Sequence, residues 1–257
     1  MRPGRAQRAP TEWATLLLSL LLLAGSMSAA AAPVPHTLTD QTGKTLTLPA
    51  QVNKIVAIPI PLASMVMAID GGTTRLSGIN SAAKSDIDEG LLGRMFPGAA
   101  KISTRIAGDN FVPNSEALAA SRADLVIQWG DRGEAIIDPI RTLHIPMLTL
   151  RYGDSLWAAE WLRLTGAALG KAERGERLAV WFEKHVAKIT ALGEAVPAKS
   201  RPRVLHLTRA REALVAAGKG TSMDGDIRRT GGVNLAGEVP GFSQISVEQL
   251  LAWNPDI

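Results

Sequence analysis

Cysteine is absent from the 257-residue sequence, and its absence excludes several kinds of chemistry. Without cysteine, the chain has no disulfide, no thiolate metal site and no cysteine nucleophile. A lipoprotein-type anchor is excluded as well, because that anchor needs a cysteine at the cleavage point. Long apolar runs are also missing beyond the N-terminal segment, and spanning a bilayer takes about 20 apolar residues. We therefore expect a mature protein without crosslinks or membrane spans.

A strong excess of either charge is missing too. The 28 basic and 24 acidic residues give a formal net charge of +4. The first 12 residues contribute half of this excess, so the remainder carries about +2. That balance is too mild to indicate nucleic-acid binding, and no basic stripe with interleaved aromatics is present. With 46% hydrophobic and only 20% charged residues, the chain is expected to fold.

The N-terminus has the pattern of a secretory signal. Its positive charges come from Arg2, Arg5 and Arg8. An apolar run at 14–24 follows, and small residues at 26–32 offer cleavage sites. The alternative is a membrane anchor, but about 11 apolar residues are too few to span a bilayer. We expect residues 1–31 to be a signal peptide cleaved after Ala31, and the mature protein to be periplasmic.

Residues 32–153 alternate between short apolar runs and helical patterns. A hairpin is predicted over 37–48, with Gly43 in its turn. The predicted buried strands cover 54–60, 76–80, 125–129 and 147–150. The predicted helices cover 62–69, 115–121 and 135–144. Strands that alternate with helices at this spacing predict a parallel sheet covered on both faces, and therefore an α/β lobe.

Residues 154–197 are predicted to be linking helices. One helix over 171–192 has apolar residues in steps of three and four, which predicts a single apolar face. These residues are Leu178, Trp181, Phe182, His185, Val186, Ile189 and Leu192. We expect His185 to be packed on that face. We also expect the glycines at 166, 170 and 175 to separate this helix from the one before it.

Residues 198–257 are predicted to begin a second α/β lobe. The predicted strands cover 203–208 and 214–217, and the predicted helices cover 222–230 and 247–253. An internal echo links the two lobes: Glu116 precedes Leu118 by two residues and Asp124 by eight, and Glu248 precedes Leu250 and Asp256 in the same way. The first copy predicts a helix, a break and a buried strand, so the second should too. The chain stops one residue into that strand, which leads us to expect an incomplete second lobe.

Four segments resemble the periplasmic binding proteins for ferric siderophores, haem and cobalamin that serve ABC importers. They are TLTDQTGKTLTLPAQVNKIVAI at 37–58, PNSEALAASRADLVI at 113–127, IIDPIRTLHIPMLTL at 136–150, and GGVNLAGEVPGFSQISVEQLLAWNPDI at 231–257. Ala123 and His144 stand where that family usually has proline and glycine. The resemblance implies two Rossmann-like lobes with parallel sheets, joined by one long helix. Family members usually continue for tens of residues past the last segment, so we expect a C-terminal truncation.

The resemblance also implies roles for particular residues. Glu116 and Glu248 match the carboxylates, one per lobe, that dock on arginines of the membrane permease. The alternative is helix capping, since each lies near a predicted helix start. Trp129 and Phe242 match aromatic residues that face the ligand in cobalamin-binding relatives, and ordinary packing is the alternative. Tyr152 is a further ligand-binding candidate, although it does not match the axial tyrosine of haem-binding relatives.

Arginines at predicted strand ends and loops would favour an anionic ligand. They are Arg105, Arg132, Arg151, Arg209 and Arg211. Solvated surface charge is the alternative for each. The segment 218–222 precedes a predicted helix and could offer backbone N–H groups to an anion, but a structural turn is the favoured interpretation. The four histidines show no ligand spacing, so we expect no metal site and no cofactor.

These patterns favour a monomeric binding subunit, without catalysis, that captures a small molecule and delivers it to an ABC permease. An iron chelate is the first expectation for the ligand, ahead of cobalamin or an oxyanion such as molybdate. An exported hydrolase is the competing class, but G-x-S-x-G, H-E-x-x-H and a convincing triad are missing. A soluble sensor that feeds a membrane receptor is a third interpretation.

Overall fold

A computed structural model describes residues 35–108, 110–152 and 156–257. The expected signal peptide, residues 1–31, lies outside this range. Across the described residues, no helix is long and apolar enough to cross a membrane. Residues 35–257 form one compact unit.

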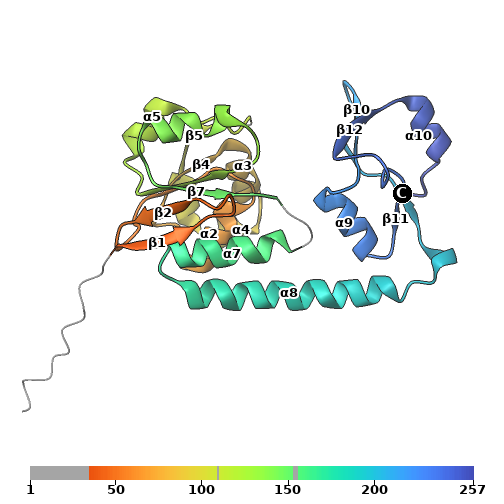
Figure 1. Ribbon diagram of the computed structural model, residues 1–257, viewed down its shortest axis with the longest axis horizontal. Coiled ribbons are helices and arrows are strands. Elements are labelled where there is room, and N and C mark those ends of the chain that lie inside the picture. The colour runs from red at the N-terminus through yellow and green to blue at the C-terminus, as the bar shows by residue number, and fades with distance from the viewer. Residues whose placement is uncertain (1–34, 109, 153–155) are drawn as a thin grey trace, which may run out of the picture. The chain divides into compact units, whose positions relative to one another are not determined.

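Strands and helices alternate through residues 36–150, as the sequence predicts (Figure 1). The strands are β1 (His36–Thr39), β2 (Thr45–Leu48), β3 (Ile55–Ala57), β4 (Leu76–Asn80), β5 (Ser103–Ala107), β6 (Leu125–Trp129) and β7 (Met147–Leu150). The helices are α2 (Leu62–Asp70), α3 (Ser81–Glu89), α4 (Leu91–Met95), η1 (Pro97–Lys101), α5 (Ser115–Ser121), η2 (Glu134–Ile136) and α6 (Asp138–Thr142). The predicted hairpin is confirmed, because β1 pairs with β2 in antiparallel register around Gly43.

The predicted parallel sheet is confirmed. Its strands follow the order β5-β4-β3-β6-β7, and every pair in it is parallel. The chain builds outward from β3 to β5 and then returns to the other side of β3 with β6 and β7. In open α/β sheets of this kind, ligands bind beyond the carboxyl ends of the strands where the winding reverses, here beside β3 and β6.

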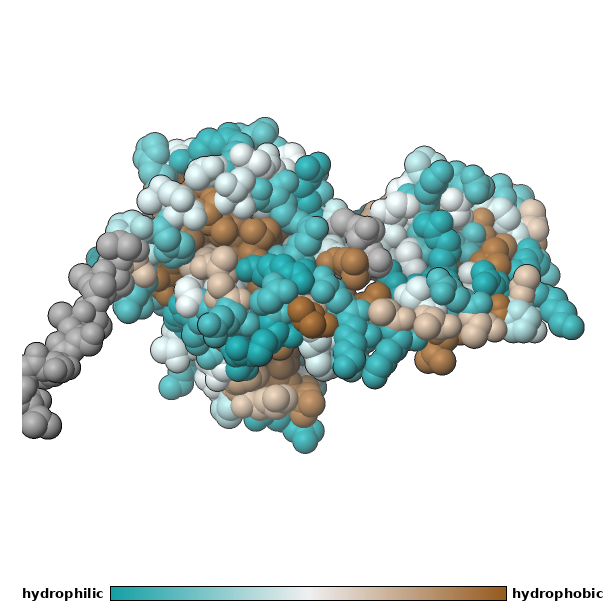
Figure 2. All heavy atoms as spheres, turned by 60° about the horizontal axis from the view of Figure 1, so that its bottom comes forward, coloured by the Kyte–Doolittle hydropathy of each residue, from teal (hydrophilic) through white to brown (hydrophobic). Residues whose placement is uncertain are grey.

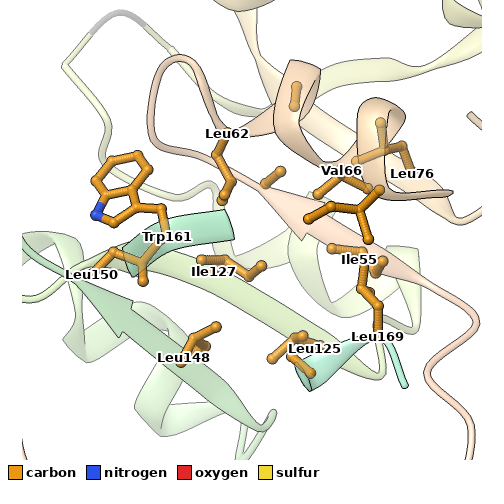
Figure 3. Close-up of a cluster of buried hydrophobic side chains, with 14 of the residues drawn as sticks. Ile55, Leu62, Val66, Leu76, Leu125, Ile127, Leu148, Leu150, Trp161 and Leu169 are labelled. Atoms are coloured by element: carbon orange, nitrogen blue, oxygen red, sulfur yellow. The ribbon is translucent and has the colours of Figure 1, made fainter. Parts of the chain in front are cut away.

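Successive residues of the central strands point to opposite faces of the sheet. Ile55 and Ile127 belong to one buried cluster, whereas Val56 and Val126 belong to another. Figure 3 shows the first cluster, where side chains of β3, β6 and β7 meet Leu62 and other residues from the covering helices. Leu118 of α5 lies in the second cluster. Both faces are therefore covered, which explains why these strands are continuously apolar.

The predicted long helix is confirmed as α8 (Ala172–Glu194), which follows α7 (Trp157–Ala168). The expectation for the three glycines is wrong in two cases. Gly170 separates the helices at φ +66°, but Gly166 and Gly175 lie within them. A Cβ on Gly166 would meet the Gly175 Cα at 2.8 Å. These two glycines therefore let α7 and α8 approach each other closely.

The apolar face of α8 is buried over only part of its length. Leu178 and Phe182 pack on the buried cluster of the parallel sheet. Trp181, Ile189 and Leu192 are exposed, at 59%, 45% and 74%. His185 is half-buried, with its ring 4.1 Å from that of Trp181. Figure 2 turns toward the viewer the side on which Figure 1 draws α8. Hydrophobic residues, in brown, lie there among hydrophilic ones, in teal. The sequence pattern thus predicted the helix but not how far its apolar face is covered.

The C-terminal lobe differs from the expected parallel sheet. Its elements are η3 (Ala198–Ser200), β8 (Arg203–Val204), β9 (Leu207–Arg209), β10 (Leu214–Ala217), α9 (Ser222–Arg229), β11 (Val233–Asn234), β12 (Phe242–Ile245) and α10 (Val247–Trp253). Only β8 and β11 are parallel, whereas β10 is antiparallel to both β9 and β12. The single strand predicted over 203–208 is two strands in different sheets. The backbone changes partner between them, since the Leu205 N–H bonds to Ile257 and the His206 carbonyl accepts from Ala217.

The internal echo corresponds to repeated backbone geometry. The Asp124 carboxylate accepts from the backbone N–H of Lys54, and the Asp256 carboxylate accepts from that of Arg203. The N–H groups of each aspartate and of the residue after it point to the carbonyl of that same partner. Both preceding helices, α5 and α10, end on a left-handed residue, Arg122 or Asn254. The predicted helix and break of the second copy are therefore confirmed.

The glycine contact between α7 and α8 is testable. Gly175→Ala should lower the free energy of unfolding by about 1–3 kcal/mol, because its Cβ would lie 2.6 Å from the Leu162 carbonyl oxygen. Gly225→Ala in α9 is the matched control, since its Cβ would meet only the flexible end of Arg229. That control should be neutral or stabilising by up to about 1 kcal/mol. Urea titration of both variants measures the difference, and equal effects would contradict the close-contact interpretation.

Candidate ligand-binding cavity

A cavity of about 520 Å³ lies beyond the carboxyl ends of β6 and β7. Its walls come from the loop after β6, from Tyr152 after β7, from the start of α9 and from the start of β12. The residues that line it are Asp131, Arg132, Tyr152, Gly220, Thr221, Ser222, Met223, Gly241 and Phe242. Its position agrees with the general rule for ligands of open α/β sheets. Residues of both the N-terminal and the C-terminal lobe therefore contribute to this cavity.

Among the described residues that line this cavity, Arg132 is the only lysine or arginine. Its guanidinium carbon lies 4.3 Å from the ring centre of Trp129, 5.5 Å from that of Tyr152 and 5.7 Å from that of Phe111. These are cation–π distances, which hold a guanidinium over an aromatic face while its N–H edge stays free. Within the described residues, Arg132 has no ion pair or hydrogen bond. Its donors therefore remain available to a ligand.

Trp129 lies beneath Arg132 rather than on the cavity surface. It is 1% exposed and does not line the cavity. Its ring is 4.4 Å from that of Tyr152 and 5.2 Å from that of Trp161, and Trp157 completes the cluster at 4.7 Å from Trp161. The sequence predicted a ligand contact for Trp129, and the structure places it where it supports Arg132 and Tyr152.

Tyr152 combines a partly exposed ring with a bonded hydroxyl. The hydroxyl donates to the Ile60 carbonyl oxygen at 2.8 Å. Burial raises the pKa of the phenol above its ordinary value, and the positive charge of Arg132 acts in the opposite direction. The phenol is therefore neutral at physiological pH. It offers the cavity a polar edge without a negative charge.

The wall opposite this cluster is the start of α9. Thr221 caps the helix, because its hydroxyl oxygen accepts from the Asp224 N–H at 3.2 Å. The backbone N–H groups of Ser222 and Met223, in the first turn, have no acceptor among the described residues. Such unbonded N–H groups, together with the helix dipole, make a favourable place for an anion. The sequence of segment 218–222 allows this chemistry, although a structural turn was the favoured interpretation.

Phe242 forms an apolar wall at the start of β12 and is 56% exposed. Met223 lies on the same cavity. Phe242 was predicted from sequence, whereas Met223 and Asp131 were not. No sequence signal marks those two, because their positions depend on how α9 and the loop after β6 meet.

The other arginines predicted at the site lie elsewhere. Arg105 lines a separate cavity of about 410 Å³ together with Glu116. Arg151 is exposed, and its backbone N–H is bonded to Gln41. Arg209 and Arg211 are exposed and do not line the cavity of Arg132. Among the five arginines proposed from sequence, the structure brings only Arg132 to this cavity.

Glu116 and Glu248 are exposed residues in the first turns of α5 and α10. These helices begin in the same way, with the side chains of Asn114 and Ser246 as their N-caps. Hydrogen bonds from its own backbone N–H and from Ser246 hold the pKa of the Glu248 carboxyl below its ordinary value. Neither glutamate lines the cavity of Arg132. Both carboxylates are thus available to a partner.

Metal ligands do not gather in the described part of the chain. There, no group of three or more histidine, aspartate or glutamate side chains could hold a metal ion.

A doubly wound lobe, a long connecting helix and a cavity walled by residues of both lobes define the class of solute-binding proteins. Residues 107–257 match the family described as periplasmic binding protein, and the chain belongs to that family. These proteins serve ABC importers, so the family expected from sequence is confirmed.

Proteins similar to this chain carry names that specify different ligands. The molybdate-binding protein MolA of Haemophilus influenzae is 24% identical, over 95% of this chain and 72% of its own. A periplasmic solute-binding protein of Veillonella parvula is 28% identical with a TM-score of 0.71, over 87% of this chain and 67% of its own. The haem-binding protein RhuT of Roseiflexus is 26% identical with a TM-score of 0.66, over 80% and 74%.

The different burial of Trp129 and Phe242 predicts different effects on stability. Trp129→Ala should lower the free energy of unfolding by about 3–5 kcal/mol, because it removes a fully buried aromatic side chain. Phe242→Ala should change it by no more than about 0.5 kcal/mol, because most of that ring is exposed. Denaturant titration of both variants checks this, and a large loss in Phe242→Ala would show that its ring is packed.

Proposed function

We propose that this protein captures an anion in the cavity of Arg132 and delivers it to an ABC permease. The observation that carries this proposal is the unpaired guanidinium of Arg132 on the same cavity as the first turn of α9. Charge-assisted hydrogen bonds from a guanidinium are about twice as strong as neutral ones, and a helix start adds N–H donors. Among the described residues that line this cavity, Asp131 is the only other charged one.

A small oxyanion such as molybdate is the first candidate ligand. It needs several N–H donors, which the Arg132 guanidinium and the backbone N–H groups of Ser222 and Met223 offer around the cavity. The similarity to the molybdate-binding protein MolA extends over 95% of this chain and supports the same choice. This choice reverses the order expected from sequence, which put an iron chelate first.

An anionic iron chelate, of the siderophore or haem type, is the second candidate. A cavity of about 520 Å³ is in the range typical of drug-sized ligands and exceeds what one tetrahedral oxyanion fills. The apolar side chains of Met223 and Phe242 would contact the organic part of such a chelate. The haem-binding relative RhuT supports this alternative. Cobalamin is a further alternative, supported by Phe242 on the cavity wall but by neither of these two relatives.

Arg132→Ala should weaken molybdate binding about 10- to 100-fold, since it removes a hydrogen-bonded charge worth about 1.5–3 kcal/mol. Arg209→Ala is the matched control, because this exposed arginine does not line the cavity. Isothermal titration with molybdate, sulfate, ferric citrate and haemin ranks the ligands for each variant. Tighter binding of a chelate than of molybdate would select the second candidate. Equal losses in both variants would overturn the role of Arg132.

Delivery would use Glu116 and Glu248 as docking points, one in each lobe. Both are exposed carboxylates at equivalent places in the repeated helix starts. Two separated negative charges fix the orientation of a partner that carries arginines and speed its association. Capture and release then need no catalytic step, which fits the role of this family as the binding subunits of transporters. We propose that the protein acts as a monomer.

Charge reversal tests this docking. Glu116→Lys and Glu248→Lys should each reduce ligand uptake into vesicles that contain the cognate permease and ATPase, because like charges then meet. Ligand affinity should stay unchanged, since neither residue lines the cavity. Glu173→Lys is the control: Glu173 is exposed on α8, which packs on the face of the sheet opposite to α5. Equal uptake by all three variants would contradict the proposal.

A further inference from the structure

Gln128 is a buried polar residue in a strand that is otherwise apolar. It belongs to β6, whose five residues are all buried, and it is 0% exposed. Burying a primary amide is costly unless its polar atoms are hydrogen-bonded. A methionine or leucine would pack in such a strand without that cost. The presence of an amide here therefore calls for a reason beyond packing.

The amide of Gln128 joins three backbone segments. Its Nε2 donates to the Phe111 carbonyl at 3.0 Å and to the Ile136 carbonyl at 3.2 Å. Its Oε1 accepts from the backbone N–H of Trp129 at 2.9 Å. Both donor hydrogens and one acceptor site are in use, so the amide is satisfied on each side. One side chain thus ties the loop before α5 and the turn η2 to the end of β6.

These bonds enclose the segment that carries Arg132. The bond from Gln128 to Ile136 closes a loop with Arg132 at its middle. The bond to the Phe111 carbonyl holds the backbone of the residue whose ring lies 5.7 Å from the Arg132 guanidinium. The bond from the Trp129 N–H holds the backbone of Trp129, whose ring lies beneath that guanidinium at 4.3 Å. All three contacts of the amide therefore reach the surroundings of Arg132.

The backbone of Phe111 supports this interpretation. Its φ of +64° lies in the left-handed region, which a bulky side chain rarely adopts. Such a conformation persists only where the surroundings hold it, and it is concentrated at binding sites. The bond from Gln128 to the Phe111 carbonyl is one of the contacts that hold it.

We propose that Gln128 is a positioning residue for ligand capture, whose buried amide holds the loops on both sides of Arg132 so that its guanidinium is fixed at the cavity. The proposal rests on the proposed function, because it assigns the anion contact to Arg132. Gln128 itself touches no ligand and acts through Arg132. It determines how well the guanidinium is preorganised before the anion arrives.

Gln128→Met tests the proposal, because it keeps the volume of the side chain and removes all three hydrogen bonds. Titration with molybdate should show affinity about tenfold weaker than in the unmodified protein. In an Arg132→Ala background the same change should have little further effect, because two residues that act through one contact are not additive. An equal loss in both backgrounds would show that Gln128 affects the fold in general and would overturn the proposal.

Thr149→Val is the matched control. Thr149 is a second buried polar residue, 2% exposed, on the neighbouring strand β7, and its hydroxyl bonds to Asp40 and Thr42. This variant should lose stability without losing affinity for molybdate. A loss of affinity as large as that of Gln128→Met would overturn the specific role of Gln128.

Hydrogen exchange in the ligand-free protein separates this proposal from the proposed function. Amide exchange in residues 130–136 should be about tenfold faster in Gln128→Met than in the unmodified protein, and unchanged in Thr149→Val. If the unmodified protein binds neither molybdate nor a chelate, the proposed function fails, while faster exchange still supports the loop-holding role. Unchanged exchange in Gln128→Met would overturn that role whichever ligand binds.

Discussion

Everything in this structure depends on burying both faces of one parallel sheet. Alternate residues of β3 and β6 enter different cores, and helices must cover each side. Because helices cover both faces of the sheet, the chain segments of the strands become accessible to solvent only beyond the strand ends. The winding of the sheet reverses beside β3 and β6, and Arg132 lies three residues after the end of β6. The topology of the sheet therefore sets the position of the cavity, at the carboxyl ends of the strands, whichever residues line it.

At the cavity, the positive charge of Arg132 lies over a cluster of aromatic rings. Trp129, Tyr152 and Phe111 surround a guanidinium that has no carboxylate partner within the described residues. Because the rings hold the cation without neutralising it, its N–H groups stay available for an anion. The first turn of α9 contributes further donors to the same cavity. The buried Trp129 ring supports Arg132 from below and does not itself line the cavity.

Much of the fold was predictable from the sequence. The strands at 76–80, 125–129 and 147–150 and the helix at 247–253 have the predicted bounds, because apolar runs and capping residues are local signals. Helix 81–89 was missed because most of its residues are polar, and β5 because its first three residues, Ser103 to Arg105, are polar as well. At the site, Arg132, Tyr152 and Phe242 were found, whereas Arg105 and Arg209 lie elsewhere. The positioning role of Gln128 was missed because the sequence shows only a single polar residue in an apolar strand, not the segments that its amide contacts.

By itself, the sequence determined the class of fold, the long helix and the family, since periodicity, turns and motifs are encoded between near neighbours in the chain. Only the tertiary structure decided which glycine ends a helix and which ones let two helices touch, because Gly170 and Gly175 look alike in sequence. It also decided which arginine reaches the cavity. Those outcomes depend on contacts between segments far apart in the chain, and local patterns carry no information about such contacts.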